Sequence, residues 1–576
     1  MRKINVKRFP FKLLAVIPAL ALGFLLWKYG VNCPFMDEWD TPGLDLVQFN
    51  LGELNFDRLI RQHNESRKFF PRLLFIYLSQ SGWNPRYGML ISLLLSCLTT
   101  FNIYYLSKLA LKNHVSRIAC LVLTSMLIFS PMQWENWLWG LQMITFVPIA
   151  AITSASVIIF TQNPLIVKLL ASAALATYAT FSFANGIISW VVIFPALYLV
   201  ARKNRRSLTL ATAGWLLFFS ANVAVYFHNY HSPEHHPSFM DALAIPFQSI
   251  AYYLSFLGSP LGIHQLGLNQ IMGLGICLLI AFSGLYLFLV NHHLFERLLP
   301  WISILSYTLI SGALTTAGRV GFGVDQSLAS RYVTFSTYGV VSLIYIVAIV
   351  TEDIKSRSSK ILPIYYKFAK YIPRIALAVL LLLYPLNYAR GVRAMDITHQ
   401  NRLYGKSCLT LINIVPDREC ITNQIYPDFD SLLERANQLD KVGLIQPSLV
   451  ISDRLENITR DTYPQINYGS LENLTLTENN TYTASGWSVL PQYNAPAHAV
   501  ILAYQTEDKI NRMFAIAQAE STRKDLQQKT ENYRNIGWSK TFARDLIPDN
   551  AVSITAWAYD SKLARAYRLN TSQPIP

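Results

Sequence analysis

Charged residues are scarce in this sequence: Asp, Glu, Lys and Arg together make up 14% of 576 residues, whereas hydrophobic residues make up 52%. The 49 basic residues outnumber the 34 acidic ones, yet no zinc ribbon, basic helix or soluble basic domain accompanies them. This absence argues against a nucleic acid partner. Long apolar runs fill the first two thirds of the chain instead. The sequence therefore predicts a polytopic α-helical membrane protein.

Eleven apolar runs are candidates for membrane-spanning helices, because about 20 apolar residues cross the hydrocarbon core. The first run is short and follows basic residues, as in a signal peptide, but no small-residue cleavage site follows it, so we expect an uncleaved helix. The predicted spans lie near residues 13–28, 88–110, 116–132, 139–161, 164–182, 186–201, 207–227, 268–291, 299–316, 334–351 and 373–389.

The distribution of Lys and Arg predicts the orientation, because cytoplasmic loops retain positive charge. It places the N-terminus in the cytoplasm and the C-terminus outside. Two outer loops nevertheless contain basic residues, namely Arg58, Arg61, Arg67, Lys68, Arg72 and Arg86 in the first, and Arg319 and Arg331 before the tenth span. A lipid phosphate would explain basic residues there. For Arg319 and Arg331 the alternative is a structural ion pair with Asp325 or Glu135.

Three carboxylates, Asp37, Glu38 and Asp40, follow directly after the first span. Ionisable groups at a membrane edge must be hydrated, paired or metal-bound, and they indicate a functional site. The alternative is a solvated surface. They lie in a long first outer loop, residues 29–87, which we expect to fold as interfacial helices.

Further polar groups are expected on the same side of the membrane. They are His63, Asn64 and Glu65 in the first outer loop, Trp134 and Glu135 after the third span, and Ser330, Arg331 and Tyr332 before the tenth. Trp134 is also explained as an interfacial aromatic. A histidine-rich loop at residues 228–236 is either a metal cluster or hydrated surface.

Beyond about residue 390 the composition shifts toward Asn, Thr, Gln and charged residues. We therefore expect a transmembrane domain over 1–390, a helical extracytoplasmic region over 391–446 and a β-sandwich-like extracytoplasmic domain over 447–576. Short alternating strands separated by turn residues predict the sandwich.

Two sets of residues in the C-terminal region invite specific predictions. Cys408 and Cys420 lie a dozen residues apart on the outer side, where an oxidising compartment favours a disulfide between them. Three tryptophans in the alternating strands, Trp487, Trp538 and Trp557, either bind glycans or pack in the core.

The carboxylate motif after the first span, the large first outer loop, the short-looped spans and the terminal soluble domain resemble the glycosyltransferase C superfamily over residues 1–390. Asp37 and Glu38 resemble the pair of the protein O-mannosyltransferase and aminoarabinose transferase group. The groups His63-Asn64-Glu65, Trp134-Glu135-Asn136-Trp137 and Ser330-Arg331-Tyr332 resemble those of uncharacterised bacterial membrane-protein families. The resemblance implies a multi-pass protein of the bacterial inner membrane with a periplasmic C-terminal domain.

The resemblance also implies a reaction: inverting transfer of a sugar from a polyprenyl-phosphate-linked donor to an envelope glycan, lipid or protein acceptor. Asp37 would be the base, with Glu38 and Asp40 as alternatives. Arg67, Arg319 and Arg331 would bind the donor phosphate. The residues expected to contact substrate or support the site are His63, Asn64, Glu65, Trp134, Glu135 and Tyr332.

A divalent cation is the cofactor that the polar residues of the first outer loop suggest. Asp40, His63 and Glu65 carry the oxygen and imidazole ligands that could hold a divalent cation. No nucleotide cofactor is expected.

Two other classes of function compete with a transferase. A transporter or flippase for lipid-linked saccharides should have charged or broken helices at mid-membrane. The predicted spans are instead poor in central charge. A non-catalytic assembly or glycan-binding protein would use the β-domain as its working part and would tolerate Asp37→Asn.

Overall fold

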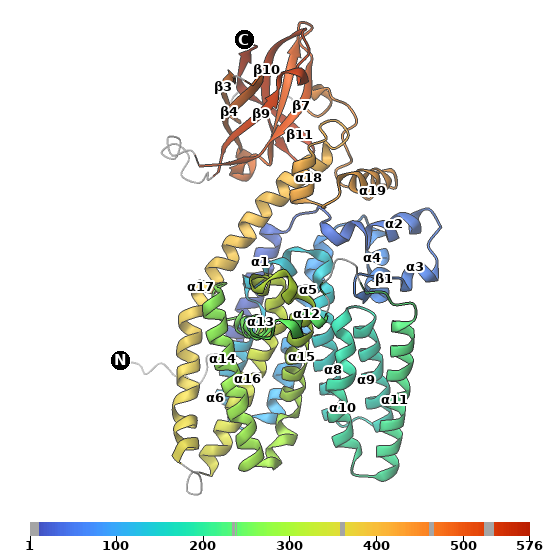
Figure 1. The fold of residues 1–576 in the computed structure, drawn as a ribbon, viewed down its shortest axis with the longest axis vertical. Coiled ribbons are helices and arrows are strands. Elements are labelled where there is room, and N and C mark those ends of the chain that lie inside the picture. Colours follow the sequence, from blue (N-terminus) through green and yellow to red (C-terminus); the bar gives the residue numbers. More distant parts are fainter. Residues whose placement is uncertain are drawn as a thin grey trace. The chain divides into compact units, whose positions relative to one another are not determined.

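The computed structural model describes residues 11–232, 237, 239–357, 363–459, 466–477, 479–522 and 535–575. The chain forms two compact units (Figure 1). Unit 1 contains Met1–Gly30, Asn55–Leu74 and Pro85–Asp396, and unit 2 contains Val31–Leu54, Phe75–Asn84 and Ile397–Pro576. Two segments of the predicted first outer loop therefore fold with the C-terminal region.

Unit 1 consists mainly of apolar helices. In the described ranges, nine helices are long and apolar enough to cross a membrane. The α-helices from the N-terminus to the last long helix are α1 (Ile17–Tyr29), α2 (Gly43–Asn50), α3 (Phe56–Ile60), α4 (Phe69–Ser79), α5 (Arg86–Ala110), α6 (His114–Ile128), α7 (Trp134–Leu138), α8 (Val147–Phe160), α9 (Leu165–Thr180), α10 (Ile188–Ala201), α11 (Arg205–Phe227), α12 (Phe239–Ala244), α13 (Pro246–Gly258), α14 (Leu266–Leu289), α15 (Phe295–Arg319), α16 (Ser330–Ser356) and α17 (Pro363–Thr410). Of these, α2 and the last five residues of α4 belong to unit 2.

The predicted spans fall on helices of this unit. Two of them, near 13–28 and 164–182, fall on the shorter apolar helices Leu13–Tyr29 and Leu165–Thr180. Local sequence explains some boundaries: a proline occupies the first turn of α8 and of α13, where its missing N–H removes no helical hydrogen bond. Long apolar runs thus give helices as expected.

Large aromatic side chains fill the core of unit 1. Trp137, Trp190 and Trp301 are fully buried, and Trp301 stacks on Tyr345 with ring centroids 3.9 Å apart. Buried aromatic rings remove much apolar surface from solvent, so they contribute strongly to packing. These contacts fix the helices that carry the polar residues described below.

Helix α17 is longer than the sequence indicates. It includes the predicted span near 373–389 and continues to Thr410, so that one helix runs from unit 1 into unit 2. Pro373 and Pro385 lie inside the helix without ending it. The predicted helical region over 391–446 therefore begins as a continuation of the last apolar helix.

The C-terminal part of unit 2 contains two antiparallel sheets. One has the order β11-β10-β6-β7 and the other β3-β4-β9-β8, with β5 paired to β4. Buried residues of both sheets form one hydrophobic core, as in a β-sandwich. The strands are β3 (Gly469–Leu476), β4 (Thr481–Leu490), β5 (Ala495–Pro496), β6 (Ala499–Thr506), β7 (Asn511–Ala517), β8 (Ala519–Ser521), β9 (Gly537–Ala543), β10 (Ala551–Asp560) and β11 (Arg565–Pro574).

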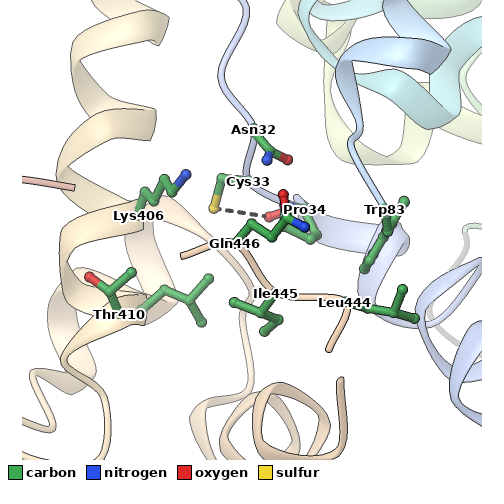
Figure 2. A pocket seen from close by; sticks show the side chains of 10 residues that line it. Asn32, Cys33, Pro34, Trp83, Lys406, Thr410, Leu444, Ile445 and Gln446 are labelled. Atoms are coloured by element: carbon green, nitrogen blue, oxygen red, sulfur yellow. Dashed lines mark hydrogen bonds between the residues drawn. The ribbon is translucent and has the colours of Figure 1, made fainter. Parts of the chain in front are cut away.

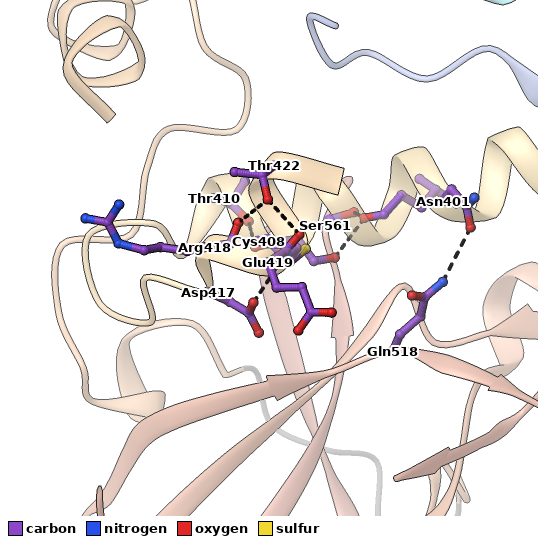
Figure 3. The surroundings of a disulfide bond; sticks show 12 residues. Asn401, Cys408, Thr410, Asp417, Arg418, Glu419, Thr422, Gln518 and Ser561 are labelled. Atoms are coloured by element: carbon purple, nitrogen blue, oxygen red, sulfur yellow. Dashed lines mark hydrogen bonds between the residues drawn. A yellow bond between two sulfur atoms is a disulfide. The ribbon is translucent and has the colours of Figure 1, made fainter. Parts of the chain in front are cut away.

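Helices α18 (Arg418–Gln424) and α19 (Phe429–Lys441) follow α17 in unit 2. Each begins at an aspartate whose side chain accepts a backbone N–H, Asp417 from Cys420 and Asp428 from Ser431, which satisfies donors that the helix leaves unpaired. A disulfide joins Cys408 to Cys420 (Figure 3), the pair that the sequence predicts. The bond holds α18 against the end of α17.

A buried histidine packs against the end of β10 within unit 2. The His498 ring lies with Nδ1 3.4 Å from an Asp560 carboxylate oxygen, but the same nitrogen accepts the Ser561 N–H at 3.0 Å. Burial and the nearby charge of Lys562 hold the pKa of His498 well below 6.5. The ring is therefore neutral, and the contact with Asp560 is not an ion pair.

Candidate active site

The three carboxylates lie in unit 2, on the short helical turn η3 (Met36–Trp39) and the residue after it. Glu38 is buried, with 1% of its surface exposed. Its carboxylate accepts the Phe35 N–H at 2.9 Å, so this side chain closes the turn that presents its neighbours. The Met36 N–H bonds the Ile425 carbonyl at 2.9 Å, which anchors the turn to the end of α18.

Asp40 has cationic and hydroxyl partners. Arg435 of α19 forms an ion pair with its carboxylate at 2.9 Å, and the Tyr426 hydroxyl donates to it at 3.1 Å. The Arg435 guanidinium lies 4.9 Å from the centre of the Tyr426 ring. A charged partner stabilises a carboxylate in its ionised form. Asp40 is thus held as part of the contact between α19 and the turn.

Asp37 differs from both neighbours. It is half-buried, and its backbone carbonyl accepts the N–H groups of Asp40 and Thr41 at 3.1 and 2.8 Å. The backbone of Asp37 is therefore fixed by the turn. All three carboxylates therefore stand on one turn whose backbone is fixed by hydrogen bonds.

Sequence analysis did not identify the cations near this motif. The Arg402 guanidinium lies 3.0 Å from the centre of the Phe35 ring, and Arg402 and Lys406 occur four residues apart on α17, a spacing that places them on one helix face. Arg435 contributes a third positive charge. The spacing of Arg402 and Lys406 is visible in the sequence, but nothing local links either residue to residues 35–40.

A small pocket lies beside the motif in unit 2 (Figure 2). Cys33, Trp83, Lys406 and Gln446 are among the residues that line it, and it has about 10 Å³ of space for the centre of a water molecule, room for about one water. Burial raises the pKa of Cys33 to about 11, so its thiol stays protonated and is a poor nucleophile. The pocket is too small for a sugar ring.

Two glutamate–arginine pairs lie in unit 1. Arg319, at the end of α15, bonds Glu65 at 2.6 Å. Arg331, in the first turn of α16, bonds Glu135 of α7 at 3.3 Å, which is longer than a typical charge-assisted hydrogen bond of about 2.7–2.9 Å. The ion pair with Glu135, which the sequence offers as the alternative to phosphate binding, is thus formed by Arg331.

Glu135 also accepts two hydrogen bonds at the start of α16. The Ser330 hydroxyl donates to it at 2.8 Å and the Arg331 N–H at 3.0 Å. A carboxylate at a helix N-terminus is favourable because unpaired N–H groups meet it there. Asn136 donates to the Arg331 carbonyl at 2.8 Å, so α7 and α16 are joined twice. The Arg331 guanidinium lies 5.3 Å from the centre of the Tyr332 ring.

His63, Asn64 and Glu65 belong to a short hairpin between β1 (Gln62–His63) and β2 (Ser66–Arg67). Asn64 has a φ of 51°, a left-handed conformation that asparagine tolerates in two-residue turns. The turn presents Glu65 to Arg319. The Tyr226 hydroxyl donates to the Glu65 carbonyl at 2.5 Å, which fastens the hairpin to the end of α11.

Arg67 is buried and bound to backbone carbonyls. Its guanidinium donates to the carbonyls of Tyr226 at 2.6 Å, Ile60 at 2.9 Å and His228. Arg72 likewise donates to the carbonyls of Leu59 and Arg61, at 2.8 and 2.6 Å. These two arginines thus serve as hydrogen-bond donors to the backbone around the hairpin.

His63 sits among these cations. Its Nδ1 lies 2.8 Å from the Lys68 ammonium, which donates to it. Burial, followed by the charges of Lys68 and Arg72, lowers the pKa of His63 to about 2. The ring is therefore neutral at physiological pH.

The predicted ligands of a divalent cation each have another partner. Asp40 pairs with Arg435, His63 with Lys68 and Glu65 with Arg319. Over the described ranges, no group of three or more His, Cys, Asp or Glu side chains is arranged to hold a metal ion. In the histidine-rich loop, residues 233–236 lie outside the described ranges.

The predicted site residues thus fall into two groups, the carboxylates in unit 2 and the hairpin, Glu135, Arg319 and Arg331 in unit 1. Trp134 and Tyr332 flank Glu135 and Arg331 in the sequence. No family model matches the chain, and no curated protein or solved structure is similar to it.

Proposed function

We propose that the protein is an integral-membrane inverting glycosyltransferase that moves a sugar from a polyprenyl-phosphate-linked donor to a glycan, lipid or protein acceptor on the extracytoplasmic face. Nine long apolar helices in the described ranges support a multi-pass protein. The loop distribution of Lys and Arg supports a cytoplasmic N-terminus and an extracytoplasmic C-terminal domain. The resemblance of Asp37 and Glu38 to the glycosyltransferase C motif supports the reaction class and a bacterial inner membrane.

The turn on which the three carboxylates stand is the observation that carries the proposal. Glu38 accepts the Phe35 N–H and Asp40 pairs with Arg435, and half-buried Asp37 precedes both of them on the same turn. A general base must be held in place and must reach the substrate. Asp37 stands on a fixed backbone and is partly exposed, and its place in the motif resembles that of the first carboxylate of the glycosyltransferase C pair, so we assign it the role of base.

The reaction requires one base. The acceptor hydroxyl oxygen attacks the anomeric carbon from the face opposite the phosphate, and its proton passes to the Asp37 carboxylate. The bond between the anomeric carbon and the phosphate oxygen breaks, and its electron pair leaves on the phosphate. Phosphate is a good leaving group, so no second carboxylic acid is needed, unlike in glycoside hydrolysis. A positioned base contributes about 100- to 10,000-fold in rate.

For the donor phosphate we assign Arg319 and Arg331. Both are only partly buried, with 22% and 36% of their side-chain surface exposed, so an anionic ligand can reach them. The 3.3 Å contact of Arg331 with Glu135 is weak enough for a phosphate to displace, because Glu135 keeps its two bonds at the start of α16. Arg67, bound to three carbonyls, supports the hairpin rather than the phosphate.

The transporter alternative is less well supported. Substrate sites of secondary transporters form where helices are broken near mid-membrane. Helices α10 and α15 contain Pro195 and Pro300 but continue through them. We therefore favour chemistry over transport.

The test is release of free polyprenyl phosphate from a panel of lipid-linked sugars by membranes that contain the wild type or a variant. Asp37→Asn should abolish release while donor binding persists, because the amide keeps the size but cannot take the proton. Glu38→Gln and Asp40→Asn should lower the amount of folded protein more than the turnover per folded molecule. Asp57→Asn, an exposed aspartate of the same predicted loop, is the matched control and should behave as the wild type.

Equal turnover in wild type and Asp37→Asn would remove Asp37 as the base. If the wild type releases no polyprenyl phosphate from any donor but moves lipid-linked sugar between leaflets, the transport function replaces the proposal.

A further inference from the structure

The β3-β4-β9-β8 sheet has two faces of different chemistry. One face contributes Leu471, Tyr482, Ala484, Trp538 and Phe542 to the hydrophobic core. Side chains alternate between the faces of a strand, so the strand register defines the members of the other face. Gly537 and Ala543 lie on this face, and the exposed glutamates Glu472 and Glu520 occupy the bulges of β3 and β8 beside it. Its polar and aromatic members, called the hydroxyl face here, are Ser470, Asn473, Thr475, Thr481, Thr483, Ser485, Trp487, Ser521, Ser539 and Thr541.

No member of the hydroxyl face is ionisable, although the chain has a formal net charge of +15. Every member is partly or fully exposed within the described structure of unit 2. Solvent-facing strands usually carry lysine and other charges, which keep a sheet soluble and unattractive to other strands. The face therefore displays hydroxyl and amide groups at positions where solvent-facing strands usually carry charged side chains.

The hydroxyl groups are arranged in cross-strand rows. Thr483 of β4 lies opposite Thr541 of β9, and their hydroxyl oxygens are 2.9 Å apart. Thr475 of β3 lies opposite Thr483 on the other side and donates to its carbonyl at 3.4 Å. A hydroxyl both donates and accepts hydrogen bonds, so these rows can pair with a ligand that does the same.

Trp487 is the aromatic member of the face. It lies opposite Ser470 of β3 and Gly537 of β9. A glycine opposite an aromatic residue leaves room for the ring to lie over the partner strand. Gly537 is buried and Trp487 is half-buried, as expected when the indole covers the glycine and keeps its other side open. By contrast, Trp538 and Trp557 are 1% and 7% exposed and pack inside.

We propose that the hydroxyl face binds a neutral glycan, with Trp487 as the stacking platform. The C–H side of a pyranose ring is apolar and packs on an indole, while the sugar hydroxyls exchange hydrogen bonds with the serine and threonine rows. Charge complementarity selects the ligand: a face without ionisable groups leaves the charges of an anionic glycan unpaired, and such a mismatch disfavours binding. This binding does not depend on the proposed transferase activity.

The experiment measures binding of maltohexaose, cellohexaose and mannohexaose to the full-length protein by calorimetry, with an anionic heparin hexasaccharide for comparison. The protein is held in a detergent without a sugar headgroup, since a maltoside would compete. At least one neutral hexasaccharide should bind, and Trp487→Ala should weaken its binding about tenfold or more, the loss typical of a buried aromatic contact. Trp487→Tyr, which keeps a ring, should retain binding within about threefold.

Three further variants separate loss of the site from loss of folding. Thr483→Glu keeps Trp487 but places a charge among the hydroxyl rows, and it should weaken neutral glycan binding about tenfold. Leu546→Ala removes an apolar side chain that is 50% exposed in the same unit and should bind as the wild type, with the same unfolding temperature. Asp37→Asn should also bind as the wild type, which distinguishes this site from the proposed active site.

The inference is overturned if no neutral hexasaccharide binds the wild type, if Trp487→Ala binds as tightly as the wild type, or if the heparin hexasaccharide binds more tightly than all neutral ones. In each of these cases the serine and threonine rows serve only the packing and solubility of the sheet.

Discussion

Two pairs of arginines in unit 1 have partners of opposite kinds. Arg67 and Arg72 donate to backbone carbonyls, whereas Arg319 and Arg331 bond carboxylates that are partly exposed. A backbone carbonyl is fixed in the fold. If the arginine turned to a ligand, the carbonyl would lose its hydrogen-bond donor. A partly exposed carboxylate can return to water. The first pair therefore supports the fold, and the second is available for a ligand.

Removal of a carbonyl-bound arginine should give the largest effect. Arg67→Ala leaves the carbonyls of Tyr226, Ile60 and His228 without this donor, and it should cost about 1–3 kcal/mol of unfolding free energy. Thermal unfolding of the purified protein measures the loss. Arg61→Ala, at an exposed position in the same segment, is the control. A loss as small for Arg67→Ala as for Arg61→Ala would contradict a structural role.

Removal of a carboxylate-bound arginine should affect turnover instead. Arg331→Ala should lower polyprenyl phosphate release about 100-fold if its charge stabilises the leaving phosphate. The unfolding free energy should fall by less than about 1 kcal/mol, because partly exposed ion pairs contribute little. Arg331→Lys should recover part of the activity, since it restores the charge without the planar guanidinium. Loss of stability with unchanged turnover would place Arg331 with Arg67.

Acid should destabilise the carbonyl-bound region first. His63 has its pKa lowered to about 2 by burial and by Lys68 and Arg72, whereas an unfolded histidine titrates near 6.5. Below about pH 6.5 the His63 ring therefore binds a proton in the unfolded chain but not in the folded chain, and the free energy of unfolding falls as the pH drops. His498, whose pKa is also lowered, adds to this loss.

The expected slope is about 1.4 kcal/mol per pH unit for each histidine between pH 6.5 and the folded pKa. Unfolding temperatures of wild type and His63→Asn, measured from pH 7.5 to 5, test it. The variant should lose stability less steeply, and parallel curves would show that His63 titrates normally in the folded protein.

Salt should produce the smallest effect and should act on the carboxylate-bound pairs. High salt screens partly exposed charges and should lower the unfolding free energy by less than about 1 kcal/mol. The hydrogen bonds of Arg67 to carbonyls should be insensitive. A double-mutant cycle of Arg319→Ala with Glu65→Gln, run in low and high salt, measures the pair directly. Equal coupling at both salt concentrations would show that the pair is shielded from solvent.

The helices, the strands and the disulfide depend on local patterns in the sequence, and these features could be predicted. Apolar runs gave the helices, alternation gave the strands of the C-terminal sheets, and the separation of Cys408 and Cys420 gave the disulfide. The partners of the carboxylates could not be predicted, because Tyr426 lies 386 residues from Asp40. No periodicity encodes such a pairing. The continuous α17 was also missed, since a proline inside a helix commonly ends or kinks it.

The carbonyl partners of Arg67 escaped prediction for a related reason. The charge of the basic residues in an outer loop predicts that they bind phosphate. Their roles depend instead on which acceptors the folded backbone brings near them. For Arg67 two of the three acceptors, the carbonyls of Tyr226 and His228, lie about 160 residues away at the end of α11. Charge patterns therefore identify candidate residues, and tertiary contacts show which of them bond backbone carbonyls and which bond carboxylates.

The pairing of Asp40 with Tyr426 and Arg435 also sets an order of events during synthesis. Ribosomes add about 5–20 residues per second, so a gap of 386 residues corresponds to about 20–80 seconds of translation. Throughout that interval the carboxylate turn has been made, but the helices that hold it have not. An unfinished chain therefore has no assembled carboxylate motif, and the motif is completed only when the C-terminal region folds.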